Sequence, residues 1–152
     1  MTLFGGEMTS NSKLMEATAP CGIDCFNCQL FGDNIHSAPI ELIERIETSF
    51  PGKLPCRGCR INGCPLTPAG CETRICVLGQ GHDFCFRCEN FPCSRLSPVA
   101  EGAQIYPHNL KLYNLMRIRS RGLEKWAREA SANRDAYFKG KFSIGTGPVT
   151  TD

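Results

Sequence analysis

Cysteine content constrains this sequence more than any other feature. The chain has 152 residues and eleven cysteines, and all eleven lie between Cys21 and Cys93. Closely spaced cysteines in a short chain form either a disulfide framework or a set of metal ligands. An odd number of thiols cannot all form disulfides, and the first twenty residues lack the apolar run of a secretory signal. We therefore expect a cytoplasmic protein whose thiols are reduced and bind metal.

Six of the cysteines form three C-x2-C pairs. This spacing places two sulfurs on the same side of a tight turn, where neighbouring backbone amides point at them, and it suits metal ligation. The surrounding segments are rich in glycine and proline, so the burial of cysteine as a small apolar side chain does not explain the pattern. The three pairs are Cys25/Cys28, Cys56/Cys59 and Cys85/Cys88.

The other cysteines add to these pairs. The pattern C-x2-C-x4-C occurs twice, ending at Cys64 and at Cys93, and predicts two versions of one metal-binding loop. A closed structural zinc site takes four ligands, so eleven cysteines fill two sites and leave three thiols over. A third site needs a bridging thiolate, a carboxylate or a histidine; His82 is the best-placed histidine, although an ordinary loop position is favoured for it. The candidate ligands are Cys21, Cys25, Cys28, Cys56, Cys59, Cys64, Cys71, Cys76, Cys85, Cys88 and Cys93.

All-thiolate coordination suits either zinc or an iron–sulfur cluster. We favour zinc, at about two ions per chain with a third as the upper limit. The iron–sulfur alternative rests on the segment Cys21-x3-Cys25-x2-Cys28, which has the spacing of a radical S-adenosylmethionine cluster loop. That chemistry belongs to a large barrel of repeated strand–helix units, and this sequence does not predict such a barrel.

Three motifs carry a family resemblance. They are CGIDCFNC at residues 21–28, CRGC at 56–59 and CFRCENFPC at 85–93. Together they resemble a small bacterial and archaeal cysteine-rich family of unknown function, over about residues 20–96. The resemblance implies zinc binding and no assigned reaction. It implies a ligand role for every cysteine except Cys64.

The chain length predicts one domain. We expect a flexible leader at residues 1–19, a single cysteine-rich zinc-binding domain at 20–140, and a tail at 141–152. Within the domain, residues 20–96 form the metal core and residues 97–140 a helical part. The predicted fold is a small metal-stapled domain, mainly α with irregular zinc-knuckle loops and few or no long strands.

Apolar spacing predicts three helices. The first runs from Ser37 to Phe50, with Ser37 as its cap, Pro39 in its first turn and its apolar face packed over the metal core. Two more cover about 109–121 and 123–138, separated by a left-handed Gly122. The second cysteine block, residues 54–96, is expected to form loops and single turns. A short edge strand at Lys141–Ile144 is compatible with the pattern.

Positive charge is concentrated near the C-terminus. Residues 108–141 contain nine Lys or Arg and three Asp or Glu, a net charge of +6, in a chain whose total is +2. A nucleic-acid interface is one interpretation. We favour docking of the basic helices on a metal half that thiolates make negative, because Arg117, Arg119 and Arg121 alternate and cannot share one helix face. Trp126 is expected in the core.

The sequence contains no phosphate loop, no GxSxG and no HExxH motif. Asp24 and Asp83 are expected to cap turns. Cys64 and Cys93 are the candidates for a free, redox-sensitive thiol. The favoured function is a zinc-stabilised binding or accessory module with a protein partner and no membrane segment, and catalysis is not expected. The alternatives are an iron–sulfur redox or electron-transfer protein and a nucleic-acid-binding zinc protein.

Overall fold

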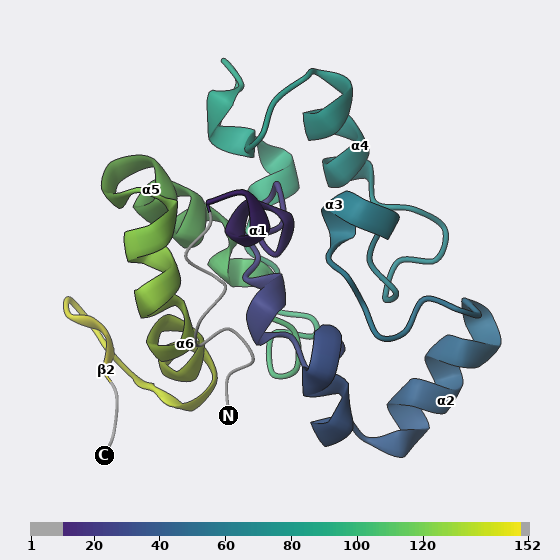
Figure 1. Cartoon of the computed structure of the whole chain (residues 1–152). Helices are drawn as coiled ribbons and strands as arrows, with labels where there is room; N and C mark the ends of the chain where they lie inside the picture. Colours follow the sequence, from purple (N-terminus) through teal and green to yellow (C-terminus); the bar gives the residue numbers. More distant parts are fainter. Residues whose placement is uncertain (1–10, 150–152) are drawn as a thin grey trace.

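The structure, a computed structural model, describes residues 11–149 (Figure 1). These residues form a small, mostly helical domain with one two-stranded sheet and long irregular connections, as the sequence predicts. The α-helices are α1 (Asn11–Glu16), α2 (Ile40–Ser49), α3 (Cys59–Asn62), α4 (Glu72–Gly79), α5 (Lys111–Arg121) and α6 (Leu123–Lys139). The 3-10 helices are η1 (Cys25–Asn27), η2 (Gly32–Ser37), η3 (Cys85–Arg87), η4 (Ser94–Leu96) and η5 (His108–Leu110). The strands are β1 (Lys141–Ser143) and β2 (Gly147–Val149).

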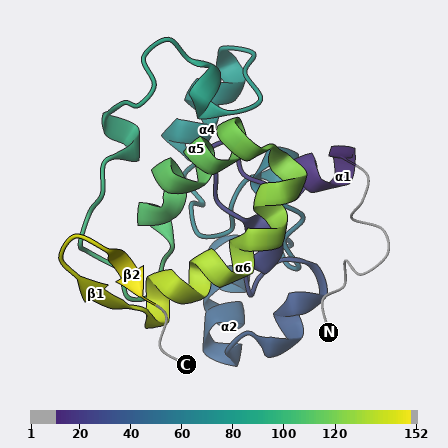
Figure 2. The ribbon, with the colours of Figure 1, turned by 90° about the vertical axis from the view of Figure 1, so that its left-hand side faces the viewer.

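The two C-terminal helices form as predicted. Gly122 separates α5 from α6 with a φ of 87°, a conformation that glycine adopts without the steric cost that other residues incur. Trp126, in the second turn of α6, is completely buried, which confirms the expectation of a core position. Figure 2 shows α6 crossing one face of the molecule from α5 towards the strands.

The larger hydrophobic core joins these helices to the cysteine-rich segments. Leu115 of α5 and Trp126 of α6 are fully buried against Phe84 and Cys85, which belong to the second cysteine block. Phe26, between the first cysteine pair, meets the Trp126 ring edge-on at 5.8 Å between centroids. The two halves of the sequence therefore share one core.

A smaller core lies under α2. Ile46 of α2 is buried against Leu30 and the side chain of Cys56, so this helix covers cysteine-bearing segments as expected. Its start differs from the prediction, because α2 begins at Ile40. Ser37 ends the separate helix η2, where its hydroxyl donates to the carbonyl of Asn34 at 2.7 Å and does not cap α2.

Residues 11–19 do not form a flexible leader. Residues 11–16 form α1, and Leu14, Ala17 and Thr18 are buried. The guanidinium of Arg60 donates to the carbonyl of Thr18 at 2.7 Å and ties this segment to α3. The expectation is corrected for these residues, since apolar side chains too few for a periodic pattern still fill the core. Residues 1–10 lie outside the described part of the chain.

The second cysteine block contains more helix than expected. Helix α4 runs for eight residues and carries Cys76, whereas the prediction for this block was loops and single turns. The reason is local: the sequence ETRICVL has no glycine or proline until Gly79, so nothing interrupts a helix there. The short strand predicted at Lys141–Ile144 forms as β1, and it pairs antiparallel with β2.

Candidate functional site

All eleven cysteines lie in the described part of the chain as free thiols. The fold separates most of them into two groups, each drawn from segments distant in the sequence. We call Cys76, Cys85, Cys88 and Cys93 the C-terminal cysteine set. We call Cys25, Cys28, Cys56 and Cys64 the N-terminal cysteine set.

The C-terminal cysteine set surrounds a small cavity of about 30 Å³. Cys76 comes from α4, Cys85 and Cys88 from the turn around η3, and Cys93 from the residue before η4. The amide of Gln80 lies between two of the sulfurs. Its Nε2 donates to Sγ of Cys76 at 3.1 Å, and Sγ of Cys88 donates to its Oε1 at 3.7 Å.

The electrostatics of Cys85 show that the members of this set lie near one another. The pKa of the Cys85 thiol is raised to about 11, mainly by burial and in smaller part by the neighbouring thiols of Cys93, Cys76 and Cys88. His82 lines the same cavity. The structure therefore places the one histidine singled out from the sequence beside this set.

The N-terminal cysteine set lines a much larger cavity of about 710 Å³, together with Cys59. The pKa of Cys56 is raised to about 11, mainly by burial and in smaller part by Cys25 and Cys28. Burial raises the pKa of Cys64 to about 12, with further contributions from Cys25, Cys56 and Cys28. Cys56 and Cys64 thus lie close enough to Cys25 and Cys28 for their charges to interact.

Backbone pairing brings the two halves of the N-terminal set together. The amide of Cys56 donates to the carbonyl of Leu30 at 2.8 Å, and the amide of Gly32 donates to the carbonyl of Cys56 at 2.9 Å. This short parallel bridge joins Phe31 to Cys56. It places the turn that carries Cys28 against the segment that begins the second cysteine block.

Backbone amides point at sulfurs in this set, as the knuckle spacing predicts. The amide of Gly58 donates to Sγ of Cys56 at 3.3 Å. Burial raises the pKa values of Cys28 and Cys64, and backbone hydrogen bonds from Leu30 and Leu66 oppose that rise. In each case the donor lies two residues after the cysteine, so the backbone favours the thiolate form that metal needs.

One repeated turn appears in both sets, and the sequence analysis missed it. The segments Cys25–Phe31 and Cys85–Phe91 share the pattern C-F-x-C-x-x-F. In each, the second cysteine's amide donates to the first cysteine's carbonyl, at 2.9 and 3.1 Å, and the final phenylalanine's amide donates to the second cysteine's carbonyl at 3.1 Å. The predicted echo of residues 56–64 in 85–93 differs, because Cys59 starts the helical turn α3. The phenylalanine spacing was the available signal.

Cys59 lines the same cavity as the N-terminal cysteine set, whereas Cys21 and Cys71 line neither cavity. A hydrogen bond with Cys59 raises the pKa of Cys25 well above its ordinary value, and burial adds to that shift. Burial raises the pKa of Cys21 to about 12, and Cys21 lies near both Cys25 and Cys85. Cys71 lies at the start of α4 and is partly exposed.

The sulfurs do not form a ready-made metal site. Among residues 11–149, no three His, Cys, Asp or Glu side chains are arranged so that they could hold a metal ion as they stand. The fold gathers each set around one cavity, and metal binding would require the sulfurs of a set to turn towards a common point. Side-chain rotations on the short turns and on α4 are the movements available for this.

Asp24, next to Cys25, is an anchor for α6. Its side chain is 1% exposed; Oδ1 accepts from Nη2 of Arg134 at 2.6 Å, and Oδ2 accepts from Nε of Arg134 at 3.0 Å. Arg134 also donates to the Asp24 carbonyl at 3.3 Å, and Oδ2 accepts from Asn27 at 2.8 Å. Asp24 precedes η1 but makes no side-chain cap hydrogen bond there, so the predicted turn cap is corrected: its carboxylate binds the Asn27 side chain and a basic helix instead.

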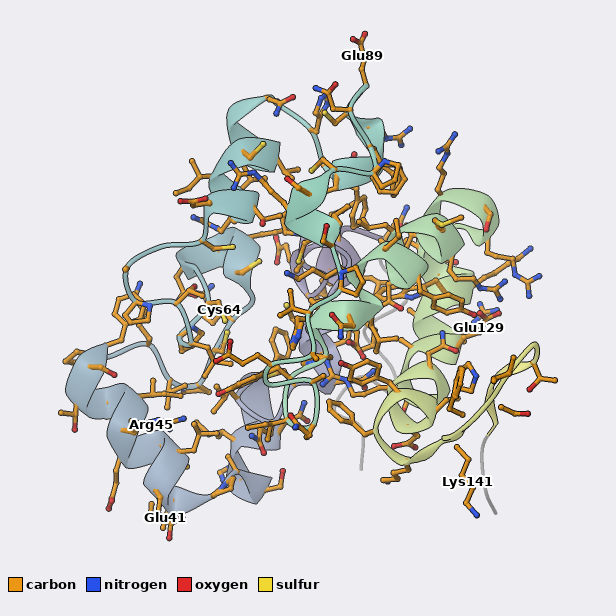
Figure 3. The ribbon with its side chains drawn as sticks, turned by 180° about the vertical axis from the view of Figure 1, so that it is seen from behind. Glu41, Arg45, Cys64, Glu89, Glu129 and Lys141 are labelled. Carbon is orange, nitrogen blue, oxygen red and sulfur yellow. The ribbon has the colours of Figure 1, made fainter. Side chains whose placement is uncertain are left out.

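Two of the three alternating arginines form ion pairs with a glutamate of the same chain. Arg117 and Arg121 share a face of α5, and both bind Glu129 of α6, with Nη2–carboxylate distances of 2.5 and 3.1 Å. Arg119 is exposed on another face. Figure 3 shows Glu129 on the side of the molecule away from Cys64. These ion pairs join α5 to α6 and use part of the positive charge of the helices.

Residues 17–98 match the family described as Protein of unknown function (DUF3795). The chain belongs to the DUF3795 family. The matched segment contains all eleven cysteines and ends before α5. The DUF3795 segment thus includes both cysteine sets, while α5 and α6 follow it and supply part of its core. The searches of curated proteins and of solved structures each found no match to this chain.

No helix within residues 11–149 is both long enough and apolar enough to span a membrane. Asp83 pairs with Arg87 at 3.2 Å on the surface, and its carbonyl accepts from Arg60. Of the two thiols considered for redox chemistry, Cys93 is exposed and Cys64 is half-buried, and both belong to cysteine sets.

Proposed function

We propose that this protein binds two zinc ions, one at each cysteine set, and that it is a zinc-stabilised binding module for a protein partner. The observation that carries the proposal is the gathering of Cys76, Cys85, Cys88 and Cys93 around one small cavity. Four thiolates and no further ligand make a closed structural zinc site. Three separate segments supply them, so a bound ion would cross-link α4 to the turns around η3 and η4.

Gln80 supports this assignment because its amide lies between two of the thiols. Hydrogen bonds from neighbouring groups to ligating sulfurs orient them and spread their negative charge. The donor Nε2 already lies 3.1 Å from Sγ of Cys76. Once Cys88 has bound a metal as a thiolate, with its proton released to solvent, the same amide can rotate its donor towards that sulfur.

The second zinc is assigned to Cys25, Cys28, Cys56 and Cys64. Support comes from their common cavity, from the backbone bridge between Phe31 and Cys56, and from the amide of Gly58 that donates to a sulfur. Cys59 and Cys21 are nearby alternatives for one ligand position. Because structural zinc supplies about 10–16 kcal/mol of apparent folding free energy per site, two ions would rival the total stability of about 5–15 kcal/mol of an ordinary domain.

Metal analysis of purified protein and of single Cys→Ser variants tests the assignment. We expect two zinc ions per chain in the unaltered protein, one in Cys88→Ser and one in Cys56→Ser. The matched control is Cys71→Ser, which alters a partly exposed cysteine outside both sets and should keep two. His82→Gln should also keep two ions, and a loss in that variant would make His82 a ligand.

Three results would contradict the proposal. Iron with acid-labile sulfide and a brown colour would make the protein an iron–sulfur protein. Protein purified without oxygen that contains neither metal, and that binds no added zinc, would leave the thiols without a metal role. Equal loss of both ions in every variant, Cys71→Ser included, would contradict the division into two sets.

A further inference from the structure

Two neighbouring cavities form one trough along α2. The cavity beside the N-terminal cysteine set has a volume of about 710 Å³, and a second cavity of about 440 Å³ adjoins it. Both are lined by Arg45, Pro65, Leu66 and Tyr106, so the two spaces adjoin at these residues. Sites for small molecules have volumes of about 300–1,000 Å³. The trough is thus large enough to hold an organic ligand. Thiols line one end of it.

The walls of the trough are largely apolar. Leu42 comes from α2, Leu66 from the loop before α4, and Ile105 and Tyr106 from the segment before η5. Leu66, Ile105 and Tyr106 are 37%, 71% and 39% exposed. Apolar side chains from three separate segments therefore offer their surfaces to the same space, and a ligand with an apolar body would remove that surface from water.

The charged residues of the trough are all positive. Arg45 and Arg134 line it, and neither cavity has an Asp or Glu in its lining. Arg134 is held by Asp24. Arg45 is exposed, and it makes no ion pair within residues 11–149. Figure 3 shows Arg45 and Cys64 on the same side of the molecule, on α2 and on the neighbouring loop. A guanidinium that makes no ion pair, beside apolar walls, is complementary to an amphipathic anion.

We propose that this trough binds a small organic anion with an apolar body. The anionic group lies beside Arg45, and the apolar body packs against Leu66 and Tyr106. This orientation follows from the position of the thiols. They lie in the larger cavity only, so any thiolate charge would repel the anion from that end, while Arg45 is shared by both cavities. The proposal requires the folded protein, and it assigns no contact between the ligand and a metal.

A pair of fluorescent probes of similar shape tests both parts of the proposal. The probes are 1-anilinonaphthalene-8-sulfonate, which is anionic, and N-phenyl-1-naphthylamine, which lacks the sulfonate. Each is titrated into the folded protein as purified, with the metal content of every sample measured in parallel. The variants are Arg45→Ala, which removes the charge, and Leu66→Trp, which fills the trough. The matched control is Arg119→Ala, an exposed arginine on α5 outside both cavities.

We expect saturable binding of the sulfonate at one site. Arg45→Ala should weaken sulfonate binding about tenfold and change binding of the neutral probe less than twofold. Leu66→Trp should weaken both, and Arg119→Ala should change neither. The proposal is overturned if the sulfonate does not saturate, if Arg45→Ala binds it as well as the unaltered protein, or if Leu66→Trp leaves both affinities unchanged. A neutral probe that binds as tightly as the sulfonate would also overturn it, in favour of a purely apolar occupant. Because metal content is measured separately, these outcomes are independent of the zinc assignment.

Discussion

Asp24 and Arg134 are 110 positions apart in the sequence, and their side chains form a two-point ion pair with an Nη2–Oδ1 distance of 2.6 Å. Asp24 is 1% exposed and Arg134 is 18% exposed, so the pair lies almost entirely inside the protein. It fastens α6 to the turn that begins with Cys25. The helical C-terminal part and the first cysteine pair are therefore connected by charge as well as by the contact of Phe26 with Trp126.

Loss of Arg134 should destabilise the protein strongly. Arg134→Ala leaves the Asp24 carboxylate buried without its partner, and breaking a buried ion pair in this way costs about 3–5 kcal/mol. Asp24→Asn should cost less, because Arg134 is closer to solvent and can hydrate its charge. Urea unfolding of the metal-loaded proteins measures both values.

The control for this prediction is Arg128→Ala, an exposed arginine on the same helix. A substitution of that kind usually changes the free energy of unfolding by no more than about 0.5 kcal/mol. An Arg134→Ala protein that loses as little as the control would show that the pair contributes nothing to holding α6 against the Cys25 turn.

Removal of metal should unfold the cysteine-rich segments. The segments between residues 20 and 96 contain short turns and short helices with two modest cores, and zinc cross-links would supply much of their stability. After treatment with a strong chelator we expect a loss of far-UV circular dichroism and rapid proteolysis within this region. Addition of zinc should reverse both changes. A chelated, metal-free protein that keeps its spectrum and resists protease would contradict a structural role for zinc.

Glu129 should titrate at an unusually low pH. Hydrogen bonds from Arg117, and then from Arg121, hold the pKa of this carboxyl below its ordinary value of 4.5. A carboxylate whose pKa is lower in the folded than in the unfolded protein stabilises the fold above its unfolded pKa. That contribution is lost as the pH falls through the folded pKa. NMR titration of the Glu129 carboxyl measures the pKa directly.

Arg117→Ala should return the pKa of Glu129 towards 4.5, and Arg121→Ala should do so to a smaller extent. The matched control is Arg119→Ala, because Arg119 lies on another face of α5 and should leave the titration unchanged. A Glu129 pKa at or above 4.5 in the unaltered protein would show that these surface ion pairs do not persist in solution, where water screens them.

The sequence by itself determined the local features. Apolar spacing and Gly122 were enough to predict α5, α6 and the break between them, because helix periodicity and a left-handed glycine act over a few residues. The C-x2-C spacing likewise predicted turns with amides aimed at sulfur, and the amide of Gly58 donates to Cys56 in this way. The sequence of α4 also lacks helix-breaking residues and could have predicted this helix. The many glycines and prolines on either side of it led to a prediction of loops instead.

Only the tertiary structure decided which cysteines meet. Cys28 and Cys56 come together through the backbone bridge at Phe31, and Cys76 reaches Cys85 because α4 places it there. Spacing along the chain specifies each turn, whereas the partners of a turn depend on which apolar faces pack and which buried charges pair. Leu115 and Trp126 against Phe84, and Arg134 against Asp24, are contacts of that kind. They join residues far apart in sequence, where local pattern carries no information, and they fix the positions at which both cysteine sets assemble.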